Sequence, residues 1–277
     1  MTDENTSEND KSSGNNKVAE TINAVTGLTQ SVPVYQDLIQ PAAQELGKGL
    51  AVIAQSVNAA LLPLRLMVWK IEDIEKRFIP KVAEKLKNTK PEDIITPKPN
   101  IAVPAIEALR YTADDESLSD LFAGLLASAM DKNKADKAHP SFVEIIKQIT
   151  ADEAEIINRF NNGIPIALID IKYKKVNQIG EFLIYENISN LESECKINNP
   201  SLIGSYINNL CRLGLVEIPS EYYMIHDDLY KRIESSPLVQ GMVIQINRMV
   251  DVEVVIRRKI LRVTSFGRLF AKACTSQ

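Results

Sequence analysis

Apolar residues in the first half of the chain recur at every third or fourth position, a spacing that predicts amphipathic helices. The longest such stripe begins at Leu46, in a helical segment between about Pro41 and Leu86. It comprises Leu50, Ile53, Val57, Leu61, Leu64, Val68, Ile71 and Ile74. Because the ring of Pro63 removes a backbone donor and clashes with the preceding turn, we expect two helices or one bent helix. Pro80 marks a second potential break, and the proline-rich stretch KNTKPEDIITPKPN predicts a linker.

Two helices are predicted directly after the linker. The stretch IAVPAIEALRYT forms the first, with Pro104 near its first turn, and ADDESLSDLFAGLLASAMD forms the second. Asp114, Asp115 and Glu116 lie at the start of the second helix, where the positive end of the helix dipole favours carboxylates. We therefore interpret the acidic trio as a helix start. A divalent-metal site would need oxygen ligands that converge from several elements.

The stretch KAHPSFVEIIKQIT contains His139, one of two histidines in the chain, directly before Pro140. Proline is tolerated at the first helical position, and Ser141 and Glu144 have the spacing of a capping box. His139 is therefore predicted to flank a helix start and not to form a chemical site.

The second half of the chain has a different pattern, and we place a domain boundary at about residue 150, where Thr150 and Glu153 repeat the capping-box spacing. IPIALIDIKYKK and the apolar part of IGEFLIYENI predict strands, although the latter also fits a helix. PSLIGSYINNLCRLGLVEI predicts a helix that stops at Gly214, then a short strand. VEVVIRRKILRVTSFGRLFAKAC predicts a strand and a terminal helix capped at Thr264 or Ser265.

The predicted elements follow the order of a winged-helix unit: a helix, a glycine, a strand, a connecting segment, a second strand and a second helix. The stretch HDDLYKRIESSPLVQGMVIQINRM lies between the two strands, where a simple winged-helix unit has a shorter wing. It predicts a helical insertion. The sequence thus predicts a mainly α fold of the α+β class. A disordered or weakly ordered polar tail at 1–40 precedes a helical domain at 41–150 and a winged-helix-like domain at 151–277.

Composition indicates a cytoplasmic setting. A chain of 277 residues with 45% hydrophobic content can bury the cores of two modest domains. Cys195, Cys211 and Cys274 are odd in number and include no CxxC pair, so neither a disulfide framework nor a zinc ribbon is indicated. The first 17 residues, MTDENTSENDKSSGNNK, lack the apolar run that a secretory signal needs.

The motifs of familiar enzymes are missing from the sequence. It contains neither a glycine-rich phosphate loop nor a GxSxG elbow, and Ser205 lies inside a predicted helix with no evident base. With only His139 and His226, one chain cannot form a multi-histidine metal centre, and we interpret HDD at 226–228 as a helix cap. Neither histidine follows an Arg within six residues, which argues against the arrangement of small RNA-cleaving toxins. We expect no enzyme activity and no catalytic, cofactor-binding or metal-binding residues.

Several motifs resemble those of the abortive-infection alpha family of bacteria. They are the proline-rich stretch ending in Asn100, EALRYT, LFAGLLASAMD, AHPSFVEIIKQ, LCRLGLVEI and LRVTSFGRLFAKAC, and the resemblance extends from about Leu46 to Cys274. It implies a role in defence against bacteriophage, in which an infected cell is shut down before progeny are released. It supplies no catalytic residues. His139, Asp131 and Trp69 are motif positions to which we assign structural roles.

A membrane surface is one partner that the sequence allows. The segment 49–69, GLAVIAQSVNAALLPLRLMVW, carries one charge at Arg65 and ends with Trp69 before Lys70, which suits a membrane interface. Its polar residues and Pro63 are costly in lipid. We therefore expect a buried core helix, with membrane-surface binding or conditional insertion as the alternative.

Nucleic acid is a second such partner, because the segment 231–277 holds nine Lys or Arg against three Asp or Glu in a chain of net charge -4. The candidate cations are Arg257, Arg258, Lys259, Arg262 and Arg268. The predicted recognition helix, around Leu202 to Leu213, carries only Arg212, which is poor for phosphate contact. We therefore expect a cytoplasmic phage-defence protein that acts by protein or membrane interaction, with a protein partner or self-association and with membrane association on activation. The alternative is a winged-helix nucleic-acid-binding regulator.

Overall fold

The computed structural model describes residues 50–64, 72–112, 114–220 and 222–275. Residues 52–277 form one compact unit of the chain. The protein is mainly helical and contains a small antiparallel sheet, which confirms the predicted mainly α fold of the α+β class. The predicted tail at 1–40 falls outside the described residues.

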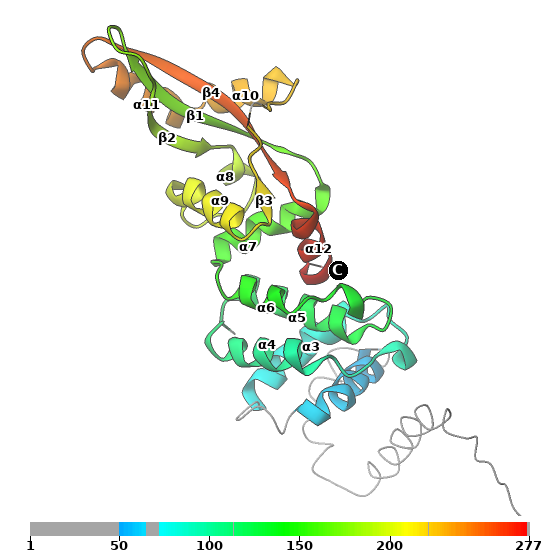
Figure 1. Ribbon diagram of the computed structural model, residues 1–277. Helices are drawn as coiled ribbons and strands as arrows, with labels where there is room; N and C mark the ends of the chain where they lie inside the picture. Colours follow the sequence, from blue (N-terminus) through cyan, green and yellow to red (C-terminus); the bar gives the residue numbers. More distant parts are fainter. Residues whose placement is uncertain (1–49, 65–71, 113, 221, 276–277) are drawn as a thin grey trace, which may run out of the picture. The chain divides into compact units, whose positions relative to one another are not determined.

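Helices form the N-terminal half of this unit (Figure 1). A helix at 50–64 is followed by α3 (Glu72–Lys85), α4 (Pro99–Thr112) and α5 (Glu116–Met130). The predicted break at Pro80 is wrong, because α3 continues through it. α4 begins inside the predicted linker, so Pro104 lies in the helix interior and not near its first turn. Both helices pack against α5, and this tertiary packing offsets the backbone hydrogen bond that each proline removes.

Side-chain caps fix the starts of several helices. Asp115 accepts the N–H of Leu118 at 3.1 Å at the start of α5, so the acidic trio is a helix start as predicted. The predicted capping box of Thr150 and Glu153 starts α7 (Ala151–Asn158). Thr264 accepts the N–H of Gly267 at 2.8 Å and caps α12 (Ser265–Cys274).

The capping box predicted at Ser141 is wrong. In α6 (Ser141–Ile146), the ring nitrogen Nδ1 of His139 accepts the N–H of Ser141 at 3.1 Å, while Glu144 pairs with Lys147 at 3.0 Å. The helical hydrogen bonds begin two residues earlier than the box requires, since the Phe142 N–H is donated to the His139 carbonyl. His139 therefore takes the capping role that the spacing assigned to Ser141.

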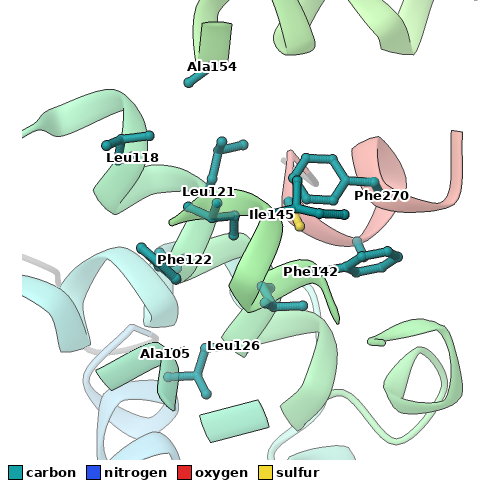
Figure 2. Packing of buried hydrophobic residues seen from close by; sticks show 14 of the residues in the cluster. Ala105, Leu118, Leu121, Phe122, Leu126, Phe142, Ile145, Ala154 and Phe270 are labelled. Carbon is teal, nitrogen blue, oxygen red and sulfur yellow. The ribbon is translucent and has the colours of Figure 1, made fainter. Parts of the chain in front are cut away.

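One large cluster of buried apolar side chains holds the helices together. In Figure 2, Leu121 and Leu126 of α5 lie among neighbours from other helices, including Phe142 of α6 and Phe270 of α12. The rings of Phe142 and Phe270 meet edge to face with their centroids 5.2 Å apart. The cluster thus contains residues from both sides of residue 150, and the domain boundary placed there stays a prediction.

The apolar stripe of the first helix belongs to the same cluster. Ile53, Val57, Leu61 and Leu64 are all buried, as expected for a core helix. Within the described residues, no helix is long and apolar enough to cross a membrane. Arg65 and Trp69, at the far end of the segment 49–69, lie outside the described residues.

Four antiparallel strands form the sheet, in the order β2-β1-β4-β3. Their bounds are β1 Ile166–Lys175, β2 Phe182–Ile188, β3 Val216–Glu217 and β4 Val252–Val263. β1 and β4 pair along the whole of β1, from Ile166 opposite Leu261 to Lys175 opposite Val252. The stretch FLIYENI, which also fitted a helix, is the strand β2.

The remaining helices flank the sheet. They are α8 (Leu191–Glu194), α9 (Ile203–Arg212), α10 (Asp227–Glu234) and α11 (Pro237–Asn247). Short 3-10 turns occur between other elements of the fold, at Pro91–Asp93, Ala135–Lys137, Arg159–Asn162 and Pro200–Leu202. α9 ends before Gly214, whose φ of 73° is the left-handed value expected of a helix stop. A second apolar cluster joins one sheet face, through Ile169 and Ile171, to Tyr230 of α10 and Val239 of α11.

The predicted winged-helix order is present as α9, Gly214, β3, the helical insertion α10–α11, β4 and α12. The strands that would form a wing, β3 and β4, pair at only two positions, Val216 and Glu217. The long ladder of the sheet joins β4 to β1 instead. The winged-helix assignment therefore stays a prediction.

Candidate functional site

The cations proposed for nucleic-acid contact lie mostly on β4, and successive side chains there point to opposite faces of the sheet. Arg258 lies on the face covered by α10, whereas Arg257 and Lys259 lie on the other face. If these residues bind phosphate, their charges must be available. Their contacts therefore show how far each charge is already used within the fold.

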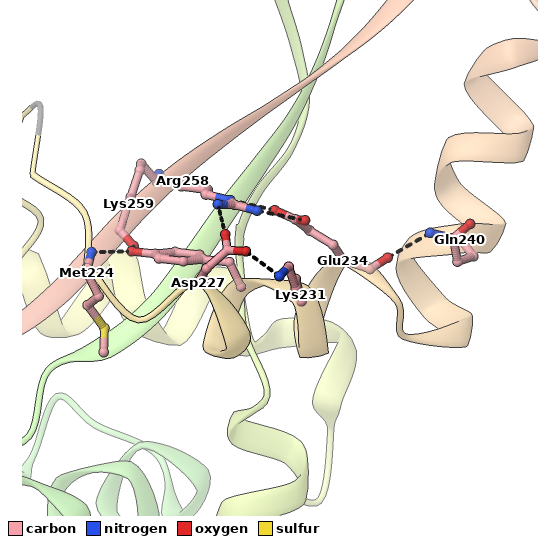
Figure 3. A network of polar contacts seen from close by, with 8 residues as sticks. Met224, Asp227, Lys231, Glu234, Gln240, Arg258 and Lys259 are labelled. Atoms are coloured by element: carbon pink, nitrogen blue, oxygen red, sulfur yellow. Dashed lines mark hydrogen bonds and ion pairs between the residues drawn. The ribbon is translucent and has the colours of Figure 1, made fainter.

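Figure 3 shows that Arg258 is held by two carboxylates of α10. Its Nε and Nη2 donate to Glu234 at 2.7 and 3.0 Å, and its Nη1 donates to Asp227. Asp227 also pairs with Lys231 at 2.6 Å. These hydrogen bonds, first that to Glu234, raise the pKa of the Arg258 guanidinium, although burial opposes them.

Tyr230 connects this network to the backbone of β4. Its hydroxyl donates to the carbonyl of Lys259 at 2.9 Å and accepts the N–H of Met224 at 2.9 Å. The Arg258 guanidinium carbon lies 5.1 Å from the centroid of the Tyr230 ring, within the range of a cation–π contact. Burial raises the pKa of Tyr230. The arrangement anchors α10 to the sheet.

Lys259 takes part in a second polar network on the opposite face. Its Nζ lies 2.6 Å from Oδ1 of Asp170 on β1 and donates to Oδ1 of Asn187 on β2 at 2.7 Å. The N–H of Asn187 is donated to Asp170 at 2.9 Å, and its side-chain amide donates to Asn208 of α9 at 2.8 Å. Asn208 in turn donates to Glu186. The network therefore joins three strands and one helix.

Asn187 has a left-handed backbone with a φ of 55°, a conformation in which Asn is enriched among non-glycine residues. It lies where the β1–β2 ladder shifts register, between the pairs Ile169–Ile188 and Ile171–Tyr185. A bulge of this kind turns a backbone N–H away from the ladder. Here that N–H is donated to the buried carboxylate of Asp170.

The other candidate cations also have internal partners. Arg257 is bound to Glu181, Arg262 donates to Glu217 at 2.8 Å, and Arg268 donates to the carbonyl of Val263 at 2.8 Å. Arg212, on the predicted recognition helix, donates to Asn209 and Gln148. Phosphate contact would have to compete with these bonds.

Asp131 and His139, two of the three motif positions, form hydrogen bonds that fix helix ends. Asp131 caps the end of α5, where it accepts the N–H of Asn133 at 2.9 Å and pairs with Lys134 at 3.2 Å. Burial acts to raise the pKa of its carboxyl, but these hydrogen bonds outweigh it and hold the pKa below the usual value. The exposed His139 caps α6. Trp69 falls outside the described residues.

Asp152 of α7 is a buried acid that the sequence reading did not single out. It accepts the N–H groups of Asn198 and Asn199 at 2.8 and 3.0 Å and the hydroxyl of Tyr206 at 3.0 Å. Burial acts to raise the pKa of Asp152, but the hydrogen bonds outweigh it and lower the pKa. Burial and the bond to Asp152 raise the pKa of Tyr206. Asp152 thus joins α7 to the loop before α9.

The HDD stretch and Ser205 do not converge with other chemical groups. His226 occupies the cap position of α10 but makes no side-chain capping bond, and Asp227 is committed to Arg258 and Lys231. Ser205 lies within α9. In the described part of the chain, no three His, Cys, Asp or Glu side chains come together as a metal site would require.

An apolar stretch at the sheet edge is the feature that sequence reasoning missed. Phe182, Leu183 and Ile184 of β2 are exposed by 44%, 50% and 38%. β2 is an edge strand whose partner in the described sheet is β1. The local signal was the unbroken apolar run in FLIYENI, but only the strand order reveals that this run lies at an edge.

Comparisons with known proteins agree with the motif resemblance. A family model described as abortive infection alpha matches residues 70–274, and no curated protein matches the chain. Among solved structures, an uncharacterized protein from the marine bacterium Alcanivorax borkumensis SK2 is 21% identical, covering 52% of this chain and 96% of that one. Its TM-score of 0.36 is too low to establish a shared fold. Because the family model spans most of the sequence, the protein belongs to the abortive infection alpha family.

Proposed function

We propose that the protein acts in abortive infection by binding a protein partner through the edge of β2, and not by catalysis. Family membership supports the role in phage defence. The observation that carries the binding surface is the run of three large apolar side chains, Phe182, Leu183 and Ile184, exposed on an edge strand. Sheet edges present unpaired N–H and C=O groups, and soluble proteins commonly protect them with charges or proline.

The chemistry of this edge selects an extended segment as its partner. An added strand would satisfy the backbone groups of β2, and its side chains would cover the apolar run. The flanking acids do not block such a strand, because Glu181 is bound to Arg257 and Glu186 accepts a hydrogen bond from Asn208. Ile184 is an extra residue on β2, since Tyr185 faces Ile171 while Leu183 faces Lys172. The bulge restricts the register that a partner can adopt and so favours a specific segment.

The polar groups favour binding over catalysis for a different reason. Asp131 and Asp152, whose pKa values are lowered, are each committed to backbone N–H groups that fix a helix end or a loop. Arg258 and Lys259 are committed to carboxylates of neighbouring elements. The hydrogen bonds and ion pairs of the described networks therefore hold neighbouring elements together, which supports a rigid binding scaffold.

Leu183→Glu tests the proposal. The new carboxylate would lie opposite Lys172, a favourable cross-strand pair, so the fold should remain intact. A charge on the edge should oppose strand addition. A loss of about 1.4 kcal/mol of binding free energy would weaken the affinity for the partner about tenfold. We expect the protection of cells against phage to fall with the affinity.

The matched control is Leu238→Glu, because Leu238 is 52% exposed and belongs to α11 and not to β2. It should leave protection unchanged. Thermal unfolding of both variants separates a folding defect from a binding defect. Full protection by a folded Leu183→Glu variant would rule out this surface.

A further inference from the structure

The β1–β4 ribbon ends in a group of exposed aliphatic side chains that no contact described so far uses. Val176 and Ile179 lie in the turn after β1 and are 68% and 106% exposed, and Val250, just before β4, is 83% exposed. The two segments lie side by side, because the N–H of Val176 is donated to the carbonyl of Asp251 at 3.0 Å (Figure 1). We call residues 174–180 and 248–252 the ribbon end.

Charge at the ribbon end favours an anionic partner. Lys175 and Arg248 are exposed and make no ion pair with any described residue, whereas Lys174 is neutralised by Glu253 at 2.8 Å. Asp251 is the only carboxylate within the two segments. α11, which leads into the ribbon end, carries no charged side chain. The unpaired charges are therefore two cations against one carboxylate, beside an apolar surface.

The residue types distinguish lipid from protein as the occupant. Protein-binding hot spots are enriched in Trp, Tyr and Arg. Of these types the ribbon end contains only Arg248, and its exposed apolar side chains are Val176, Ile179, Val250 and, at 44%, Met249. Behind the ribbon end, Tyr173 of β1 lies opposite Phe182 of β2, and the two rings stack with their centroids 5.0 Å apart. Aliphatic groups at the extremity, with aromatic rings and cations behind them, match the layers of a membrane interface.

We propose that the ribbon end docks on anionic phospholipid, with Val176, Ile179 and Val250 in the acyl boundary and Lys175 and Arg248 at the headgroups. Neither part is sufficient alone, since apolar burial holds the protein at the surface and the cations select anionic headgroups. Of the three residues of the β2 edge only Phe182 borders this site, and the site does not depend on the segment 49–69. Binding should weaken as salt increases, because the electrostatic part is screened.

The test is flotation of the full chain with vesicles of phosphatidylcholine alone and with vesicles of equal parts phosphatidylcholine and phosphatidylglycerol. Wild type should float with the anionic vesicles and much less with the neutral ones. Combining Ile179→Asp with Val250→Asp should reduce the bound fraction about tenfold or more, and Lys175→Gln with Arg248→Gln should remove the preference for phosphatidylglycerol.

Ile225→Asp is the matched control, because Ile225 is also an almost fully exposed isoleucine in a loop but lies outside the ribbon end. It should bind like wild type. The proposal is overturned if wild type does not float with anionic vesicles, or if the Ile179 and Val250 changes leave flotation unaltered. It is also overturned if light scattering shows a wild-type dimer that these changes dissociate, since the ribbon end would then join two copies of the chain. Loss of phage protection in Leu183→Glu with normal flotation would keep the two sites distinct.

Discussion

Arg258 and Lys259 are consecutive residues of β4 whose side chains lie on opposite faces of the sheet, each fixed by a carboxylate from another element. Arg258 binds Glu234 of the helical insertion, and Lys259 binds Asp170 of β1. Alternation along a strand makes this division unavoidable. Two adjacent cations that look like a basic patch in the sequence therefore join β4 to different elements, one on each face of the sheet.

Asp170→Ala should be strongly destabilising. It removes the carboxylate that neutralises the Lys259 ammonium and leaves that largely buried cation with Asn187 as its remaining side-chain partner. Breaking a buried pair costs about 3 kcal/mol or more. Urea unfolding at neutral pH measures the change. Glu253→Gln, which breaks the exposed Lys174 pair, should cost less than about 1 kcal/mol, and equal losses in the two variants would show that the Asp170 network is not special.

Gly124→Ala should disrupt the packing of α5 on α12. A Cβ at this position would lie 1.8 Å from the carbonyl oxygen of Cys274, so one of the two backbones must move. We expect a loss of about 2 to 3 kcal/mol of stability, measured by thermal or chemical unfolding. Gly241→Ala on α11 is the control, because nothing lies within 4 Å of its Cβ. That change should raise stability by about 0.5 to 1 kcal/mol through the better helix propensity of alanine.

Asp152 should make stability dependent on pH in the acid range. Its folded pKa lies below the ordinary value of 3.8, so its carboxylate stabilises the fold above about pH 4, and this contribution is lost as pH falls through the folded pKa. Asp152→Asn should therefore be less stable than wild type by about 2 kcal/mol at pH 7. The difference should narrow below pH 4 in a series of urea unfolding curves. A gap that stays constant with pH would mean that the charge of Asp152 is not what binds the loop before α9.

His139→Ala should cost about 1 kcal/mol, because it removes the acceptor that caps α6. The ring also lies 5.8 Å from Phe142 and 6.5 Å from Phe266, contacts that add to the loss. His139→Asn, which retains a capping acceptor, should recover most of the stability in thermal unfolding. Both variants should protect cells against phage. If His139→Ala lost protection while its melting temperature matched that of wild type, the imidazole would have a functional role.

Features set by neighbouring residues could be predicted from the sequence. The capping box at Thr150 was found where its spacing indicated, and Asp115 and Thr264 cap the helix starts that were predicted at 114–116 and at Thr264 or Ser265. Pro80 failed because a local rule cannot include the packing of α3 against α5. The capping box predicted at Ser141 failed because the ring of His139 accepts the Ser141 N–H, which the Glu144 side chain would accept in a capping box.

The candidate site was beyond local patterns because it depends on strand order. Asp170, Asn187 and Lys259 are brought together only when β1 lies between β2 and β4. No local pattern around any of the three residues predicts that they contact one another. The exposure of Leu183 has the same origin, since the same apolar residue would be covered if β2 were a central strand.

The hydrogen bond from the Ser128 hydroxyl to the carbonyl of Ala273 spans 145 residues at 2.7 Å, next to the close approach of α12 to Gly124. Closing a loop of this length has a large entropic cost before any contact between α5 and α12 compensates for it. The pairing adds to the contact order of a protein whose β1–β4 ladder already joins residues far apart in the sequence, such as Ile166 and Leu261. The helices should form early and the docking of α12 should come late, so that a chain in which α12 has not yet docked exposes part of the apolar face of α5.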